Sequence, residues 1–253
     1  MMALFGFPNM RVPGVEMSGE VEAAGKDVRR FKVGDQVFGT TTGMRYGANA
    51  EYVCVPEESR HGVVMKKPES LSHEEVAPLT VGGMTALQLL RKAGIEEGDD
   101  VLVYGASGSV GTFAVQLAKV LWGARVTGVC SGRNADIVRS LGADDVVDYT
   151  REDFTVRERR YDVVFDAVNE LPRSKREVAL KPGGTFMSVF TPTTEDTEDL
   201  ALLTRLVQEG KLRAFVDRRY TLEQVPEAHR YVESGRKRGN VVVEVVPSPV
   251  TPP

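Results

Sequence analysis

The sequence predicts an α/β fold, in which a doubly wound parallel sheet forms the larger part and a smaller region is mostly β. Residues 71–210 alternate between short apolar β-like runs and amphipathic helical segments, a pattern that requires right-handed crossovers and a parallel sheet covered on both faces. A glycine-containing turn at residues 105–111 joins one such strand to a helix. Residues 12–55 instead hold β-like runs separated by Gly, Pro and Asp turns.

Each element follows from its hydrophobic period and its turn signals. In the first region the expected strands are residues 15–23, 36–39 and 50–55. Ser72 and Glu75 form a capping box that opens a helix running with interruptions toward Leu90. The five strands of the parallel sheet are expected at residues 100–104, 125–129, 145–149, 161–167 and 184–190. The remaining elements are a β-run at 215–220, a helix at 222–234 and a last strand at 240–246.

The turn at residues 105–111 predicts a dinucleotide site. Gly108 would let the backbone approach a pyrophosphate, and Gly111 would let the helix pack closely on the strand. The helix N-terminus would offer free N–H groups and a partial positive charge to the phosphates. Ala106 stands where the G-x-G-x-x-G fingerprint has its first glycine. The helix is supported by apolar residues at i, i+3, i+4, i+7 and i+11, which are Val110, Phe113, Ala114, Leu117 and Leu121.

The residues after the next strand favour NADPH over NADH. An NAD site places an Asp or Glu on the ribose 2′-hydroxyl about 20 residues after the glycine turn, but here the strand ends in Ser131, Gly132 and Arg133. A hydroxyl and a guanidinium suit a 2′-phosphate, because Arg donates charge-assisted hydrogen bonds. The alternative is that Arg133 is only a solvated side chain near the start of a helix at residues 134–140.

Composition favours an enzyme-like globular chain with a small-molecule partner. The 253 residues are 42% hydrophobic and carry a net charge of −4, which gives no basic field for nucleic acid. No stretch is long enough to span a bilayer, so we expect no membrane partner and a cytoplasmic location. Cys54 and Cys130 are too few for a disulfide framework, and each lies in a β-like run, so both are expected to be buried free thiols.

Six segments resemble the zinc-free, quinone-reductase-like branch of the medium-chain dehydrogenase/reductase superfamily, in the family's order and over nearly the whole chain. They are residues 25–39, 50–56, 105–119, 129–134, 141–149 and 227–231. The resemblance implies a partial GroES-like β domain, formed by residues 1–80 and 211–253, beside a Rossmann domain formed by residues 81–210. NADPH and substrate would bind between the two domains.

The resemblance also implies which residues contact NADPH. A plain structural role is the alternative for three of them: Thr85 as a capping or packing residue of its helix, Tyr149 as an interface aromatic and Arg238 as a solvated charge. The implied contacts are Thr85, Ser107, Gly108, Ser109, Val110, Gly111, Ser131, Arg133, Tyr149, Ala167, Val168, Arg238 and Gly239.

The sequence predicts no metal site. Zinc-containing members of the superfamily carry Gly-His-Glu where this chain has Gly14, Val15 and Glu16, and a four-cysteine lobe that is absent here. The three histidines, His61, His73 and His229, are not spaced as a ligand set. Without a metal to polarise a carbonyl, the resemblance implies hydride transfer from NADPH to an acceptor that delocalises charge by itself, such as a quinone or an α,β-unsaturated carbonyl.

Departures from the family pattern leave the catalytic residues unknown. The chain begins close to the Gly-His-Glu position, so the first strands and the segment lining the substrate side are expected to be missing. Tyr46 is a candidate stand-in for the general acid, with a loop aromatic as the alternative; Ser109 and Asn169 replace glycines of the family. Two other hypotheses stay open: an NADPH-binding protein with little or no turnover, and an incomplete reading frame that starts upstream. The physiological substrate does not follow from the sequence.

A second departure concerns assembly. Only residues 191–196 separate the fifth strand from the next helix, too few for the sixth edge strand that commonly pairs across a family dimer. We therefore expect a five-stranded sheet with the fifth strand at its edge and the usual dimer impaired. Phe186, Val189 and Phe190 would lie beside unpaired backbone groups, which invites edge-to-edge association. The expected state is a monomer or a concentration-dependent oligomer.

Overall fold

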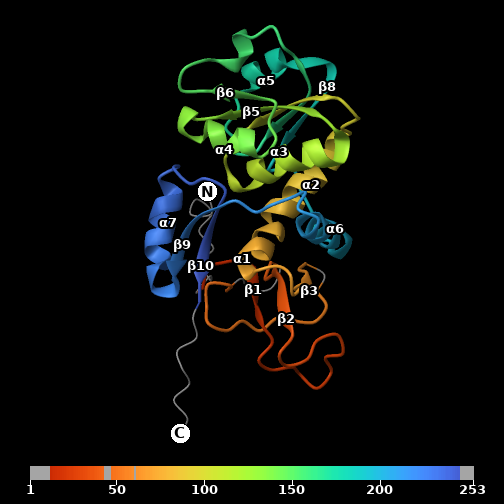
Figure 1. Cartoon of the computed structure of the whole chain (residues 1–253), viewed down its shortest axis with the longest axis vertical. Coiled ribbons are helices and arrows are strands. Elements are labelled where there is room, and N and C mark those ends of the chain that lie inside the picture. The colour runs from red at the N-terminus through yellow and green to blue at the C-terminus, as the bar shows by residue number, and fades with distance from the viewer. Residues whose placement is uncertain (1–11, 43–46, 60, 246–253) are drawn as a thin grey trace.

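The computed structural model describes residues 12–42, 47–59 and 61–245. The molecule is elongated, with a five-stranded parallel sheet at one end and a three-stranded antiparallel sheet at the other (Figure 1). A two-stranded sheet with helix α7 (Val225–Glu233) lies beside them, and helices α2 (Gly82–Ala93) and α6 (Thr197–Gln208) lie in the middle. Tyr46 lies outside the described residues.

The five-stranded sheet confirms the predicted Rossmann part. Its order is β6-β5-β4-β7-β8 and every neighbouring pair is parallel. The fifth strand of this sheet begins at Leu180 and ends at Ser188, against the expected residues 184–190. It ends early because the chain turns after Ser188, where the Thr191 amide donates to the Ser188 carbonyl at 2.8 Å. The strands are β4 (Asp100–Tyr104), β5 (Arg125–Cys130), β6 (Asp145–Asp148), β7 (Tyr161–Asp166) and β8 (Leu180–Ser188).

Both faces of this sheet are covered. In β4, Val101 and Val103 point into the main core, while Leu102 points into a second, smaller core on the opposite face. This alternation is the period of two that a strand imposes on its side chains. The main core also holds residues of α2, α3 (Ser109–Trp122), α4 (Ala135–Ser140) and α6; the smaller core is closed by a 3₁₀ turn, η4 (Phe154–Val156), and by α5 (Arg173–Ala179).

The N-terminal sheet contains β1 (Glu16–Glu20), β2 (Gln36–Thr40) and β3 (Val64–Lys66), all antiparallel. The predicted strand at residues 50–55 is wrong: Tyr52 is 56% exposed, and β3 occupies the position beside β2. A strand needs a neighbouring strand for its backbone hydrogen bonds, and this segment pairs with none in the described part of the chain. Cys54 is consequently exposed, not buried as expected, whereas Cys130 is buried in β5.

The remaining elements follow the prediction closely. The capping box is present, with the Ser72 amide donating to the Glu75 carboxylate at 2.8 Å, and it opens α1 (His73–Val76). A 3₁₀ turn, η2 (Ala77–Leu79), then interrupts the helical run before α2. The last strand, β10 (Asn240–Glu244), pairs in parallel with β9 (Val216–Thr221), so among the described residues it does not join the N-terminal sheet.

The connection between β8 and α6 contains no strand, so β8 is an edge of the five-stranded sheet, as predicted. Gln88 of α2 holds this connection by donating to the Thr194 carbonyl at 2.7 Å and accepting from the Thr194 amide at 2.9 Å. Glu195 accepts a hydrogen bond from the Thr40 hydroxyl of β2. Within the described ranges, no helix combines the length and apolarity that a bilayer crossing requires.

Candidate nucleotide-binding site

The turn between β4 and α3 has the backbone that the glycine pattern predicts. Gly105 has a φ of +79°, in the left-handed region that favours glycine, and an added Cβ there would lie 2.7 Å from a Val168 methyl carbon. At Gly111 an added Cβ would overlap the Gly105 carbonyl oxygen and lie 2.9 Å from the Ala106 Cα. We expected Gly111 to let the helix pack closely on the strand, and the structure places its closest neighbours in the turn that directly follows that strand.

Gly108 is different, because it faces open space. It is the N-cap of α3, with φ −82° and ψ 178°, and an added Cβ would have its nearest neighbour, the Gly105 carbonyl oxygen, at 3.4 Å. Steric contact within the protein therefore does not require a glycine here. A ligand approaching the backbone closely does require one, which is the role that the nucleotide prediction assigns to this residue.

A loop from the C-terminal region closes against this turn. The Gly239 amide donates to the Ser107 carbonyl at 2.8 Å, and Gly239 forms a parallel bridge with Gly108. The Ser109 hydroxyl donates to the Asn240 amide oxygen at 2.5 Å. The structure thus brings Ser107, Gly108, Ser109 and Gly239 together, and the serine that replaces a family glycine has a hydrogen-bond partner. Val110, on the first turn of α3, packs against the main core.

A groove of about 590 Å³ lies at the carboxyl ends of β5 and β6 and brings Ser131, Arg133 and Tyr149 together. Arg133 is exposed, and Tyr149 is 57% exposed. The groove also contains residues that were not predicted from the sequence, because they lie at the end of the third strand and just after it, whereas the cofactor preference was read from the residues after the second strand. These are Asp148, Thr150 and Arg151, beside Gly132.

Asp148 brings a carboxylate into this groove, and the protein itself uses its oxygens. Asp148 accepts hydrogen bonds from the Thr150 hydroxyl at 2.7 Å and the Thr150 amide at 3.0 Å. These bonds, together with one from the Gly132 amide and the nearby Arg151 charge, lower the pKa of Asp148 below its ordinary value. Arg151 Nε lies 3.8 Å from a carboxylate oxygen of Asp148. The carboxylate is thus partly neutralised within the groove.

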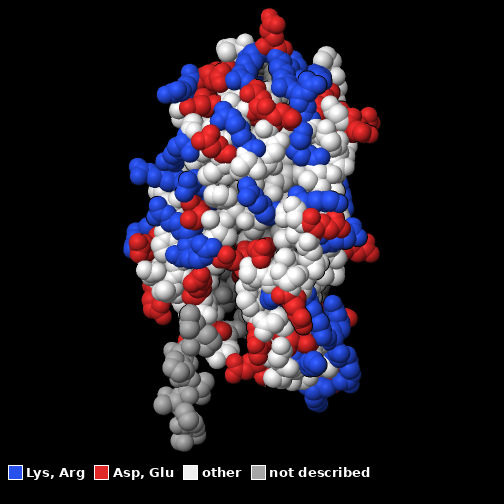
Figure 2. Space-filling model, viewed as in Figure 1, with Lys and Arg blue, Asp and Glu red and all other residues white. Residues whose placement is uncertain are grey.

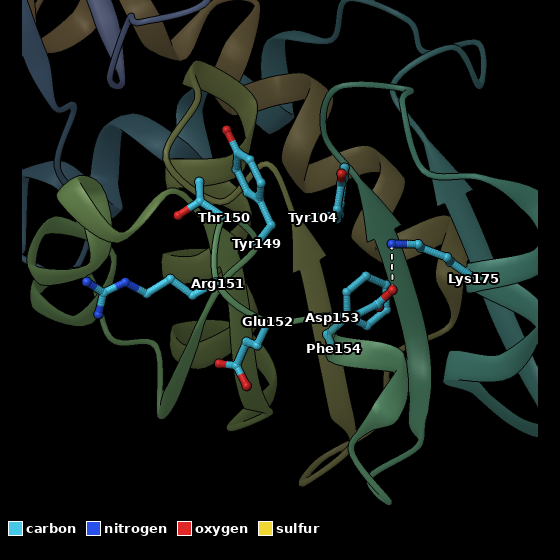
Figure 3. Close-up of a pocket in the computed structure, with 8 residues that line it drawn as sticks. All are labelled: Tyr104, Tyr149, Thr150, Arg151, Glu152, Asp153, Phe154 and Lys175. Carbon is cyan, nitrogen blue, oxygen red and sulfur yellow. Dashed lines mark ion pairs between the residues drawn. The ribbon is translucent and has the colours of Figure 1, made fainter.

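A second pocket of about 320 Å³ adjoins the groove, and Tyr149 lines both. Figure 3 shows Tyr149 and Tyr104 on opposite sides of it, with Lys175 paired to Asp153. The Lys175–Asp153 distance is 2.7 Å, and hydrogen bonds from Lys175 and Thr155 lower the pKa of Asp153 to about 2. The pocket is therefore lined by aromatic rings and by a lysine and an aspartate that are paired with each other.

The turn after β7 is held by a buried carboxylate. Asp166 is 1% exposed and accepts from the amides of Val168 at 3.0 Å and Asn169 at 2.7 Å. Asn169, which replaces a family glycine, has a φ of +56°, a conformation that Asn tolerates better than most side chains. The Ala167 amide donates to the Tyr104 carbonyl at 2.9 Å. Ala167 and Val168 thus lie at the same sheet edge as the glycine turn.

Two of the predicted contacts lie in different surroundings. Thr85 lies inside α2, partly buried, and its amide makes the ordinary helical bond to the Val81 carbonyl at 2.9 Å, so the role of its side chain stays a prediction. The Arg238 guanidinium lies 2.8 Å from Asp217, whose side chain is 1% exposed, and the Arg238 amide donates to the same carboxylate at 3.0 Å. Arg238 is therefore ion-paired rather than merely solvated, and its contact with the cofactor stays a prediction.

A pair of partly buried charged groups beside the glycine turn was not predicted. Glu16 of β1 accepts from the Val81 amide at 3.1 Å, at the start of α2, and Lys237 Nζ donates to the Gly239 carbonyl at 2.6 Å. Burial raises the pKa of Glu16 and lowers that of Lys237, while their mutual attraction opposes both shifts. The one hint in the sequence is that Lys237 directly precedes Arg238 and Gly239, two residues predicted to contact the cofactor.

Within the described part of the chain, no group of three or more His, Cys, Asp or Glu side chains is placed to hold a metal ion. His73 instead shares a hydrogen bond of 2.7 Å with the Ser18 hydroxyl. The expectation that the protein binds no zinc stays a prediction.

Comparisons with known proteins agree with this geometry. Residues 2–69 match the alcohol dehydrogenase GroES-like domain, and residues 141–201 and 187–243 match a family described as zinc-binding dehydrogenase. A 2-methylene-furan-3-one reductase of Solanum lycopersicum is 33% identical over 95% of this chain, which spans 65% of that protein. A mitochondrial NAD(P)H oxidoreductase of Danio rerio is 32% identical over 92% of this chain and 72% of its own length.

Among solved structures, the quinone oxidoreductase from Coxiella burnetii superposes with a TM-score of 0.76 at 30% identity, covering 92% of this chain and 79% of that one. Similarity of this extent, over most of this chain and of its relatives, establishes common family. The chain therefore belongs to the medium-chain dehydrogenase/reductase superfamily, where its relatives include quinone-oxidoreductase-like proteins.

Proposed function

We propose that this chain binds NADPH at the carboxyl edge of the five-stranded sheet and transfers a hydride from it to a quinone or an α,β-unsaturated carbonyl, without a metal. The observation that carries the proposal is the open space at Gly108, at the N-terminus of α3, where a Cβ would find only ordinary contacts within the protein. The amides of this turn would bind the pyrophosphate, and Gly108 would allow the close approach.

The groove beyond β5 and β6 supports the choice of NADPH. Ser131, Arg133 and Arg151 offer a hydroxyl and two guanidinium groups, which suit a 2′-phosphate. The acidic side chain in the same groove, Asp148, already accepts from Thr150 and Gly132 and lies beside Arg151, so its negative charge is partly compensated by the protein. Tyr149 and Tyr104 would border the adenine in the adjoining pocket.

The proposed acceptor follows from the relatives and from the chemistry of the site. The relatives named above include a methylene-furanone reductase and a quinone oxidoreductase, whose named substrates are both conjugated carbonyl compounds. A bound NADPH supplies the hydride; the contribution of this chain is to orient the cofactor through the glycine turn and the turn at Ala167 and Val168. Such orientation is a large share of the catalysis available to a metal-free hydride transfer.

Nucleotide titration tests the cofactor assignment. We expect NADPH to bind more tightly than NADH. Arg133→Ala should weaken NADPH binding about tenfold to a hundredfold, which corresponds to the loss of a charge-assisted hydrogen bond of about 1.5–3 kcal/mol. NADH binding should stay nearly unchanged. Arg139→Ala is the matched control, since Arg139 is also exposed and pairs with Asp136 on α4. Equal dissociation constants for NADPH and NADH in the unmodified protein would refute the preference.

Turnover is tested separately by following NADPH absorbance with a panel of quinones and enones. Oxidation that depends on the acceptor supports the reductase. Tight NADPH binding without oxidation of any acceptor supports the alternative, a nucleotide-binding protein with little or no turnover.

A further inference from the structure

Asn134 is a buried polar residue that does not perform the usual task of its position. It is the N-cap of α4 and is 4% exposed, and an asparagine at an N-cap ordinarily accepts a hydrogen bond from an amide of the first helical turn. Here the side chain makes no capping bond, and its Oδ1 atom is buried without a hydrogen-bond partner among the described residues. A buried oxygen left in this way lowers the stability of the fold. Helix capping therefore does not explain an asparagine at this place.

The hydrogen bond that the Asn134 side chain does make reaches the glycine turn. Its Nδ2 atom donates to the Ser107 Oγ atom at 3.0 Å, across 27 positions of sequence. Ser107 directly precedes Gly108, in the turn proposed to hold the pyrophosphate. Asn134 directly follows Arg133, in the turn proposed to hold the 2′-phosphate. The bond thus joins the two turns that the adenosine half of the cofactor would have to span.

This bond sets the direction of the Ser107 hydroxyl group. A hydroxyl has one donor and two acceptor sites, and the Asn134 amide group uses an acceptor site. The hydroxyl hydrogen therefore points away from Asn134, and within the described part of the chain it finds no acceptor. Ser109 differs, because its hydroxyl already donates to the Asn240 amide oxygen at 2.5 Å. Of the two serines in the turn, the partly exposed Ser107 is the one whose donor is left for a ligand.

We propose that Asn134 is a positioning residue for the cofactor. It holds the Ser107 Oγ atom as an acceptor, so that the Ser107 hydroxyl donates to the adenosine half of the cofactor, which NADPH and NADH share. This inference rests on the proposed nucleotide site. An oxygen in place of the Asn134 nitrogen would instead accept from the Ser107 hydroxyl and remove that donor from the ligand. The buried Oδ1 atom follows from turning the amide nitrogen toward Ser107.

Nucleotide titration of a double-variant cycle tests this role. The variants are Asn134→Leu, which keeps the branching of the side chain without its polar groups, Ser107→Ala, and the two combined. We expect each single variant to weaken NADPH and NADH alike, about threefold to tenfold, as for the loss of one neutral hydrogen bond. Because Asn134 acts through Ser107, the double variant should bind as a single variant does, and the two factors should not multiply.

Thermal unfolding of the same variants separates positioning from a purely structural role. Asn134→Leu removes a buried oxygen, so we expect its melting temperature to equal or exceed that of the unmodified protein while nucleotide binding weakens. A purely structural role predicts the reverse, a lower melting temperature with unchanged binding. Ser140→Ala is the control, because it removes a hydroxyl that donates to the Ile137 carbonyl within the same helix. It should leave the binding of both nucleotides unchanged.

Three results would each overturn the inference: unchanged binding in either single variant, effects that multiply in the double variant, or a loss confined to NADPH. Asn134→Ala, which cannot overpack its site, takes the place of Asn134→Leu in the cycle if the leucine variant does not fold. If the unmodified protein bound neither nucleotide, the proposed function itself would fail instead.

Discussion

Replacing Gly108 and Gly111 by alanine should separate nucleotide binding from stability, although the two glycines are three residues apart. At Gly111 the new Cβ would overlap the Gly105 carbonyl oxygen and crowd the Ala106 Cα at 2.9 Å. Overpacking of this kind costs about 1–3 kcal/mol, and the higher helix propensity of alanine offsets up to about 1 kcal/mol of it. Because both neighbours are backbone atoms, we expect a net loss of about 2 kcal/mol in the free energy of unfolding.

Gly108→Ala should leave the fold nearly unchanged. Its φ of −82° and ψ of 178° are allowed for alanine, and the nearest atom lies at 3.4 Å. Alanine is a poorer N-cap than glycine, but it also restricts the unfolded chain by about 0.4–1 kcal/mol, so these effects nearly cancel. The same Cβ would stand where the pyrophosphate must approach, and we expect both NADPH and NADH to bind at least about tenfold more weakly.

Thermal unfolding and nucleotide titration of the two variants measure both effects. For a chain of this size, 2 kcal/mol corresponds to a midpoint roughly 4–8 °C lower, which is the expectation for Gly111→Ala. For Gly108→Ala we expect a midpoint within about 2 °C of the unmodified protein. Unchanged nucleotide binding in Gly108→Ala would show that the pyrophosphate does not lie on this turn. Unchanged stability in Gly111→Ala would show that the helix can shift to accommodate a methyl group.

Two further predictions concern composition and assembly. Elemental analysis should find no stoichiometric zinc, and a chelator should leave the melting temperature unchanged, because the described residues offer no ligand set to couple metal to folding; one tightly held zinc per chain would contradict this. Light scattering after size exclusion should show a monomer, or an oligomer whose mass rises with the amount loaded. The reason is that β8 is an edge of its sheet and Phe190, just beyond it, is 57% exposed. A tight dimer at all loadings, with a sheet continuous across its axis, would show that this edge has a specific partner.

The sequence predicts the parallel sheet well because its strands are buried on both faces and are separated by strong turn signals. It also places Gly111 correctly, since helix–strand packing is a local requirement. The prediction of a strand at residues 50–55 is wrong because a β-like composition does not guarantee a neighbouring strand to pair with. The place beside β2 is taken by the short β3. The contacts of Asp217 and Glu16 could not be predicted from the sequence, because they depend on which atoms of distant segments meet. Asp217 accepts from the Arg238 amide, 21 positions further on, and Glu16 accepts from the Val81 amide, 65 positions further on.

Acidic and basic side chains are interspersed over the face shown in Figure 2, and the chain as a whole carries a net charge of −4, so it offers no broad positive field to an anionic cofactor. Attraction of the cofactor therefore depends on short-range contacts in the groove and turn, and salt should weaken binding of the nucleotide only moderately compared with a protein that steers its ligand from a distance.

The Glu16 carboxylate that caps α2 links the two domains predicted from the sequence. The sequence places a domain boundary between residues 80 and 81, yet the hydrogen bond from the Val81 amide to Glu16 crosses that boundary. If the N-terminal sheet unfolded, α2 would lose the Glu16 carboxylate that caps its N-terminus. The amides at that end of the helix would then be left to hydrogen-bond with water. The stabilities of the two parts are therefore coupled. A ligand that binds the folded form of one part also raises the free energy of unfolding of the other.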